Sequence, residues 1–173
     1  MTAAEDVSGG DDAVDDAAVD AVLAASRAMV AVATRSLSAV AEDITIAQYR
    51  TLVVLASRGP QKLADVAEQL GVTPPAAGRM CDRLARRGLV NRHRAHDDRR
   101  VVRISLSAAG RRIVDDATRR RRVFLARIVA AMPPGQRREV AAALRAFAGA
   151  AGEVPDGEWP PGPPGPAEAA SRL

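Results

Sequence analysis

The sequence predicts a mainly α-helical fold with a small β-hairpin, in which a compact lobe lies between long N-terminal and C-terminal helices. Apolar residues recur every three or four positions through most of residues 14–150, which is the period of an amphipathic helix. Residues 102–106 instead alternate apolar and polar side chains and therefore predict a strand. Only 2% of the residues are aromatic, so we expect closely packed helices whose remaining apolar surface is covered by a second copy.

The composition excludes several classes of protein. With 173 residues, 47% of them apolar, the chain can form one domain core or share a core with a second copy. Its single cysteine forms no internal disulfide, which is typical of a cytoplasmic protein. The sequence has no run of about 18 uncharged apolar residues, and its acidic N-terminus lacks the basic start of a signal peptide. We therefore expect a chain that is neither secreted nor membrane-spanning.

The two ends of the sequence differ from its middle. Residues 1–12 are small and acidic, whereas residues 152–173 contain six of the eleven prolines and show no periodicity. We expect a disordered acidic N-terminus, one folded domain over residues 13–151, and a proline-rich disordered tail. Charge is also unevenly distributed, because residues 73–122 contain fifteen arginines against five aspartates. A basic block of this kind indicates a polyanion partner or, alternatively, a solvated helix face.

Two helices are predicted before the basic block. Residues 14–41 have the periodicity of one long amphipathic helix. Thr45 and Gln48 then form a capping box, in which the hydroxyl accepts from the third helical N–H and the glutamine side chain reaches back. The helix that starts there stops near Gly59 and Pro60, because neither residue continues a helix well.

Residues 63–87 have the form of a helix-turn-helix. The first helix ends at Gly71, and Thr73 with Pro74 starts a second helix that is closed by Gly88. This second helix carries arginines on one face, and its first turn would meet base edges in a major groove. Helix pairs of this kind also occur as plain structural corners, so the pair alone does not establish DNA binding. The candidate DNA contacts on this helix are Thr73, Pro75, Ala76, Arg79, Arg83 and Arg86.

Residues 89–106 predict a β-hairpin with a charged tip. Residues 89–93 form one strand and residues 102–106 the other, and the tip contains the run His96-Asp97-Asp98-Arg99-Arg100. Two arginines on a narrow loop can enter a minor groove, where the negative potential is deepest, and a neighbouring aspartate would orient their guanidinium groups. A merely solvated turn is the alternative, although an ordinary hairpin turn would favour Asn-Gly. The candidate contacts in this wing are Arg94, Asp98, Arg99 and Arg100.

Residues 108–150 predict two further helices. Ser107 caps the first, which keeps helical spacing through the arginine run 119–122 and ends before Pro133. The second places its large apolar residues on one face. Together with residues 14–41, these helices are expected to form the core and the interface of a homodimer rather than a cofactor site.

The middle of the sequence resembles the MarR family of winged-helix regulators. The matching stretches are LADVAEQLGVTPPAAGRMCDRLARRGLVNR and DDRRVVRISLSAAGRR, and the order of helices extends the resemblance over most of the chain. The resemblance implies an obligate homodimer that binds a palindromic operator in double-stranded DNA and releases it when a small ligand binds. Residues 75–78, Pro-Ala-Ala-Gly, depart from the hydroxyl-rich start that the recognition helix often has in this family. Thr73, Arg79 and the wing are therefore left to supply the polar contacts.

We expect the effector pocket between the first, second and fifth helices, where the resemblance places the junction of dimerisation helices and DNA-binding lobe. Tyr49 and Arg35 are the candidate polar contacts on an otherwise aliphatic lining for a phenolic or lipophilic ligand. Two hypotheses remain for the chain. One is a ligand-responsive homodimeric repressor, and the other is a winged-helix nucleic-acid scaffold or protein-interaction module without an effector. Arginines on both the recognition helix and the wing favour the first.

The sequence gives little support for catalysis. His93 and His96 lie in the hairpin without a nearby cysteine to complete a zinc site, and no phosphate-binding loop or nucleophile elbow occurs. We therefore expect that the protein is not an enzyme and that it binds neither a metal ion nor a cofactor. Cys81 lies on the basic helix, where guanidinium groups would lower the pKa of its thiol and make it oxidisable. A single helical cysteine more often packs as a small apolar residue.

Overall fold

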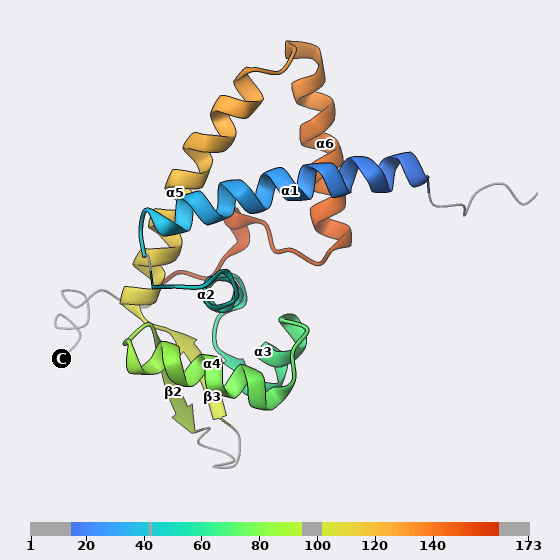
Figure 1. Cartoon of the computed structure of the whole chain (residues 1–173). Coiled ribbons are helices and arrows are strands. Elements are labelled where there is room, and N and C mark those ends of the chain that lie inside the picture. The colour runs from blue at the N-terminus through green and yellow to red at the C-terminus, as the bar shows by residue number, and fades with distance from the viewer. Residues whose placement is uncertain (1–14, 42, 95–101, 163–173) are drawn as a thin grey trace, which may run out of the picture.

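The computed structural model describes residues 15–41, 43–94 and 102–162 and confirms a mainly helical fold with a small antiparallel sheet. A lobe formed by α2, α3, α4 and the sheet lies at one end, and the long helices α1, α5 and α6 extend from it (Figure 1). The elements are α1 (Asp16–Ser38), α2 (Ile46–Arg58), β1 (Gln61–Lys62), α3 (Leu63–Gln69), α4 (Pro74–Arg86), β2 (Val90–Arg94), β3 (Val102–Leu106), α5 (Ala108–Ala130), α6 (Pro134–Ala150) and a short 3-10 helix η1 (Asp156–Glu158).

The helix ends follow the sequence signals. The Thr45 hydroxyl accepts from the Gln48 N–H at 3.2 Å, and the Gln48 side chain accepts from the Thr45 N–H at 3.0 Å, so the capping box is confirmed. Gly71 and Gly88 have φ values of 62° and 68°, a region that suits glycine, and they end α3 and α4. Thr73 precedes α4 as its N-cap, but its side chain makes no capping hydrogen bond.

The sheet has three strands rather than the two that the hairpin predicts. β3 lies in the centre, and β2 pairs with it from Val90 opposite Leu106 to Arg94 opposite Val102. The additional strand is β1, in which Gln61 pairs with Ile104 on the other edge of β3. Two residues are too few to show an alternation in the sequence, which is why β1 was not predicted.

The hydrophobic core joins the lobe to α5. Leu52 and Leu55 of α2 lie at its centre with Leu84 of α4, Ile104 of β3 and Val114 of α5, and all five side chains are buried. α2 therefore contacts both the helix-turn-helix and the long helix α5. Because these side chains belong to one cluster, α4 cannot shift far relative to α5 without opening a cavity.

A second connection between the lobe and α5 is made by Ser107 and Gly110. The Ser107 hydroxyl accepts from the Gly110 N–H at 3.0 Å and donates to the carbonyl of Gly88 at 2.7 Å, while the Ser107 N–H donates to the carbonyl of Leu89 at 3.1 Å. The first turn of α5 is thereby held against the start of the hairpin. A Cβ at residue 110 would lie 2.2 Å from the Leu89 carbonyl oxygen, so the contact requires glycine. We call this contact the Ser107–Gly110 joint.

The chain after α6 turns back onto the lobe, which differs from the disordered tail expected from residue 152. The indole N–H of Trp159 donates to the carbonyl of Val154 at 2.9 Å, and its half-buried ring packs against the core. Arg111 on α5 donates to the carbonyl of Pro160 at 3.2 Å. Proline-rich composition did not reveal this packing, because a single tryptophan and a few backbone carbonyls hold the segment. Residues 1–14 and 163–173 lie outside the described residues.

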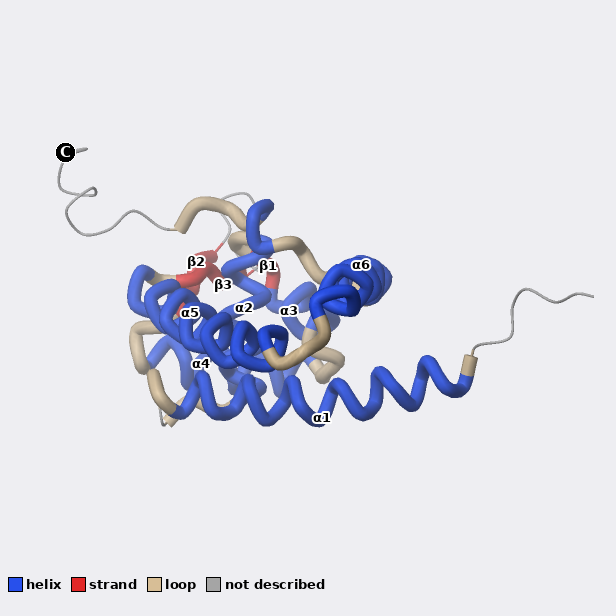
Figure 2. The backbone as a smooth tube through the Cα atoms, turned by 90° about the horizontal axis from the view of Figure 1, so that it is seen from above, coloured by secondary structure: helices blue, strands red, loops and turns tan. Residues whose placement is uncertain are grey.

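The long helices leave much apolar surface exposed. α6 has no buried residue, and α1 buries only Val32, Ser36 and Leu37 near its C-terminal end. Figure 2 shows that α1 and α6 lie apart, although they overlap in Figure 1. The large apolar side chains that remain exposed on these two helices and on α5 are Val19, Val22, Leu23, Met29, Val30, Val123, Ile128, Val129, Leu144 and Phe147.

Replacement of Gly110 by alanine tests the Ser107–Gly110 joint. We expect Gly110→Ala to lower the free energy of unfolding by about 2 kcal/mol, because strain from overpacking outweighs the better helix propensity of alanine. Gly149→Ala on α6 is the matched control, since a Cβ there meets nothing within 4 Å, and it should be neutral or raise stability by up to about 1 kcal/mol. Urea unfolding at a fixed protein concentration measures both changes. Equal stability of Gly110→Ala and the wild type would contradict the proposed role of the joint.

Candidate nucleic-acid interface

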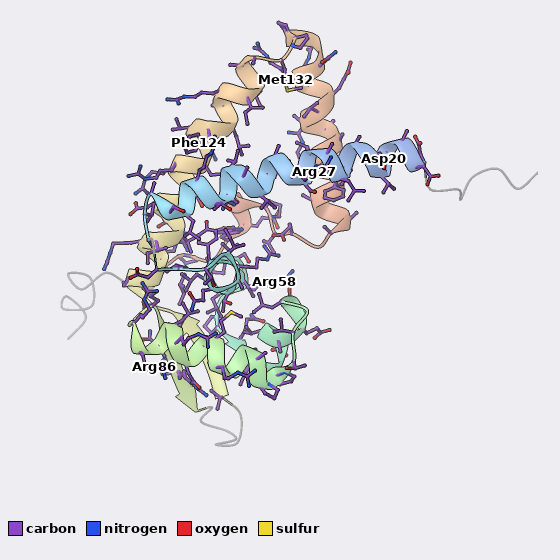
Figure 3. All side chains as sticks on the ribbon, viewed as in Figure 1. Asp20, Arg27, Arg58, Arg86, Phe124 and Met132 are labelled. Atoms are coloured by element: carbon purple, nitrogen blue, oxygen red, sulfur yellow. The ribbon has the colours of Figure 1, made fainter. Side chains whose placement is uncertain are left out.

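α4 has one face in the core and one face in solvent. Ala77, Met80, Cys81 and Leu84 are buried, and they follow one another at helical spacing. Figure 3 shows Arg86 on α4, on the side of the lobe away from α1. The candidate contacts on the solvent side are Thr73, Pro75, Arg79, Arg83 and Arg86, all exposed, and Ala76, which is half-buried. The structure therefore brings these six predicted residues together on one accessible surface.

Three contacts hold α4 in place without using Arg79, Arg83 or Arg86. The Thr51 hydroxyl lies 2.8 Å from the sulfur of Met80, which joins α4 to α2. Arg87 donates to the carbonyl of Asp43 at 2.7 Å, which joins the end of α4 to the segment between α1 and α2. Asp82 forms an ion pair with Arg92 of β2. None of these partners was predicted from the sequence, because each pair combines residues that are distant in the chain.

The exposed arginines of α4 remain available for an anion. Among the described residues, Arg79, Arg83 and Arg86 form neither an ion pair nor a side-chain hydrogen bond. Spacings of four and three residues place the three guanidinium groups along one stripe of the helix. A stripe of this kind matches the phosphates and guanine edges of a duplex, which accept hydrogen bonds from arginine.

The first turn of α4 offers fewer backbone donors than an ordinary helix start. Pro74 and Pro75 have no N–H, and the Ala77 N–H donates to the carbonyl of Thr73 at 3.0 Å. Within this turn the Ala76 N–H is the one backbone donor without a partner among the described residues, so the helix terminus offers little to a phosphate. The Thr73 hydroxyl, which makes no capping hydrogen bond, and the arginines therefore stay the predicted polar contacts of α4.

The wing is described only in part. Arg94 is the last residue of β2, and Asp98, Arg99 and Arg100 lie outside the described residues. On the described strands, His93 of β2 pairs with Arg103 of β3, and both are exposed. The minor-groove role of the wing tip therefore stays a prediction.

A hollow of about 630 Å³ lies between α2, α5 and the segment after α6. It is lined by Tyr49 and Val53 of α2 and by Arg121, Leu125 and Val129 of α5. A neighbouring hollow shares Arg121 and Leu125 and reaches α1. The effector pocket was expected between α1, α2 and α5, and of the two hollows only the neighbouring one is lined by all three helices. Arg35 is exposed on α1 and lines neither hollow, so the effector site stays a prediction.

Two buried polar atoms in this hollow have no partner among the described residues. The hydroxyl of Tyr49 and the Nε of Arg121 make no hydrogen bond, and the guanidinium carbon of Arg121 lies 5.3 Å from the centre of the Tyr49 ring. Leaving such donors unpaired is unfavourable. Arg121 was not predicted as a site residue, although its helical spacing from Val114 and Ala117 places it on the buried stripe of α5.

Cys81 lies on the buried face of α4 and packs in the core. Its side chain is fully buried, and this burial raises the pKa of the thiol above its ordinary value, while the Arg92 guanidinium acts weakly in the opposite direction. Of the two alternatives for Cys81, the structure therefore favours the packed apolar side chain over an oxidisable thiol with a lowered pKa. A thiol in this environment stays protonated and behaves as a small apolar side chain.

Comparisons with known proteins agree with this geometry. The MarR family model matches residues 44–102, which extend from the start of α2 to β3. The HTH-type transcriptional repressor MdtR of Bacillus subtilis is 33% identical over 86 residues, covering 50% of this chain and 56% of that protein. The uncharacterised HTH-type regulator YhbI of the same bacterium is 36% identical over 75 residues, covering 43% and 49%. The chain thus matches about half the length of these curated relatives.

Solved structures match over a longer part of the chain. The structure of RV1404 from Mycobacterium tuberculosis is 43% identical with a TM-score of 0.77, covering 83% of this chain and 99% of that one. A MarR family protein from Bacillus stearothermophilus is 22% identical with a TM-score of 0.65, covering 80% and 98%. FabT of Streptococcus pneumoniae, solved in complex with DNA, is 23% identical with a TM-score of 0.62, covering 77% and 94%. The last two similarities concern the fold.

Cysteine labelling tests the environment of Cys81. We expect iodoacetamide to modify native Cys81 at least about tenfold more slowly than the unfolded chain, because the thiol is buried and protonated. A cysteine introduced at the exposed Ser38 in a Cys81→Ser background is the control, and it should react at nearly the unfolded rate. If native Cys81 reacts as fast as this control, the thiol is accessible and a redox role regains support.

Proposed function

The chain belongs to the MarR family of winged-helix transcriptional regulators, DNA-binding proteins that are not enzymes, and from this premise we propose that it acts as a homodimeric cytoplasmic repressor. The dimer binds a palindromic operator and leaves it when a small phenolic or lipophilic ligand binds. The observation that carries the proposal is the stripe of Arg79, Arg83 and Arg86, which is exposed and free of protein partners among the described residues. A winged helix that served only as a protein-interaction module would not need this stripe.

The apolar surface of the long helices supports the homodimer. Phe147 and Leu144 on α6 are 52% and 40% exposed, and Val30 on α1 is 61% exposed. Exposed apolar area of this extent on a single chain favours association, because burying it removes it from water. A second copy with the same stripes is the partner that fits such a surface, since homodimer interfaces are self-complementary.

Length and composition would also allow α1 to cross a membrane, and it is the one helix of the described residues with this property. Arg27 lies midway along α1, and Asp20 is one further charge toward its N-terminal end (Figure 3). A charge at the centre of a bilayer costs about 2.5–3.5 kcal/mol on insertion scales. The helix therefore suits an interface with a second chain better than a hydrocarbon core.

The hollow beside Tyr49 supports a ligand-responsive regulator. It adjoins α5, which the Ser107–Gly110 joint connects to the lobe, and a neighbouring hollow reaches α1. A ligand there would move α5 and the attached lobe together relative to α1, and would thereby change the spacing of the two recognition helices in a dimer. Arg35, exposed on α1, would contact such a ligand only after a local rearrangement.

Substitution of Arg79 tests sequence-specific binding. If Arg79 contacts a base edge, Arg79→Ala should lose about 1–3 kcal/mol on a duplex selected from a random pool and much less on a scrambled duplex. Arg79→Lys is the matched control, because it keeps the charge but loses the bidentate geometry, and it should not restore the preference. Fluorescence anisotropy at several salt concentrations measures both. Equal losses on the two duplexes, with full rescue by lysine, would favour the scaffold hypothesis.

A further inference from the structure

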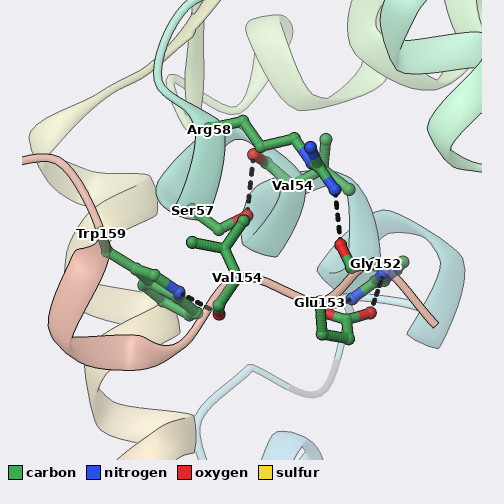
Figure 4. Close-up of polar contacts among 8 residues, drawn as sticks. Val54, Ser57, Arg58, Gly152, Glu153, Val154 and Trp159 are labelled. Carbon is green, nitrogen blue, oxygen red and sulfur yellow. Dashed lines mark hydrogen bonds and ion pairs between the residues drawn. The ribbon is translucent and has the colours of Figure 1, made fainter. Parts of the chain in front are cut away.

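The segment after α6 forms one wall of the hollow beside Tyr49. We call residues 152–162 the strap. Glu153, Asp156 and Trp159 of the strap line the same hollow as Tyr49 and Arg121. The strap is attached to α2 by Arg58, which donates to the Gly152 carbonyl at 2.7 Å (Figure 4), and to α5 by Arg111, which donates to the Pro160 carbonyl at 3.2 Å. An internal hydrogen bond from Trp159 to Val154 shapes the strap, and the Trp159 ring packs against the core. The strap is therefore part of the site and is attached to the domain by only a few contacts.

The strap places a carboxylate at the mouth of the hollow. Both terminal nitrogens of Arg50 donate to the carboxylate of Glu153, one of them at 3.1 Å. This is the two-pronged geometry with which arginine binds a carboxylate. Arg50 and Glu153 are 44% and 41% exposed, so water competes with the pair and the contact is reversible.

The interior of the hollow lacks the acceptor that its donors require. Tyr49 is 4% exposed, and its hydroxyl has no partner, nor has the buried Nε of Arg121. An N–H of a guanidinium only donates, and a phenol also donates to an oxyanion. Around them, Val53, Leu125 and Val129 provide apolar walls. The hollow thus offers donors at one point and hydrocarbon around it, which suits a carboxylate with an apolar tail.

We propose that the hollow binds a carboxylate ligand with an apolar tail, and that Glu153 of the strap is a built-in competitor that the ligand displaces from Arg50. The carboxylate of the ligand replaces Glu153 on Arg50, and the strap is released from the hollow; its release uncovers the Tyr49 hydroxyl and the Arg121 Nε, which then donate to the same carboxylate. This inference rests on the proposed ligand-responsive function, and it specifies the chemistry of the ligand and the part of the chain that moves.

Octanoate is the probe, because it combines a carboxylate with a short apolar tail, and 1-octanol is its uncharged counterpart. Titration calorimetry on the full chain gives the dissociation constants. Glu153→Gln removes the competing charge, and Glu158→Gln removes one charge from the same strap at an exposed position that does not line the hollow. We expect Glu153→Gln to bind octanoate about threefold to fivefold more tightly than the wild type, as expected for loss of an exposed ion pair. Glu158→Gln should match the wild type, and neither change should alter binding of octanol.

Trp159 reports the position of the strap, since it is the single tryptophan of the chain. Saturation with octanoate should make Trp159 more accessible to acrylamide and increase the quenching of its fluorescence. In Glu153→Gln, quenching should already be increased without ligand. The proposal is overturned if octanoate does not bind, if octanol binds as tightly, or if both glutamine variants gain equally. It is also overturned if quenching of Trp159 stays constant on saturation. These measurements need no DNA. If the chain failed to bind DNA, the proposed regulatory function would be contradicted, but the proposed binding of a carboxylate in the hollow would still be decided by these measurements alone.

Discussion

The contact between Ser107 and the start of the hairpin determines how the two halves of the molecule are arranged. The Ser107 hydroxyl bridges the Gly88 carbonyl, at the end of the recognition helix, and the Gly110 N–H, in the first turn of α5. The missing side chain of Gly110 lets α5 approach the Leu89 carbonyl. Because one residue caps the long helix and holds the lobe, movement of α5 is transmitted directly to α4.

This connection gives the exposed arginine stripe a defined orientation. The core residues of α2 contact both α4 and α5, and the pairs of Asp82 with Arg92 and of Arg87 with Asp43 hold α4 from its sides. A preorganised recognition helix loses little freedom on binding, so its contacts contribute fully to discrimination between sequences. Since two prolines remove backbone donors from its first turn, we expect the arginine side chains to carry a larger share of recognition than in a helix with an open N-terminus.

Much of the fold could be predicted because it depends on local signals. The capping box at Thr45, the glycines at residues 71 and 88 and the cap at Ser107 each act within a few residues, and all four end or start an element where expected. The strand β1 could not be predicted, because its existence depends on the edge of β3 rather than on its own two residues. Of the candidate site, the α4 surface followed from helical spacing, and the same spacing places Arg121 on the buried stripe of α5, whereas the strap required knowledge of what packs against α5.

In the proposed dimer, two copies of this chain present their recognition helices at a fixed spacing. Selection of duplexes from a random pool, followed by light scattering of the complex, tests it most directly. We expect a palindromic sequence with half-sites about 10 bp apart, or a multiple of that distance, and two chains on each duplex. A selected sequence without symmetry, bound by a single chain, would contradict it.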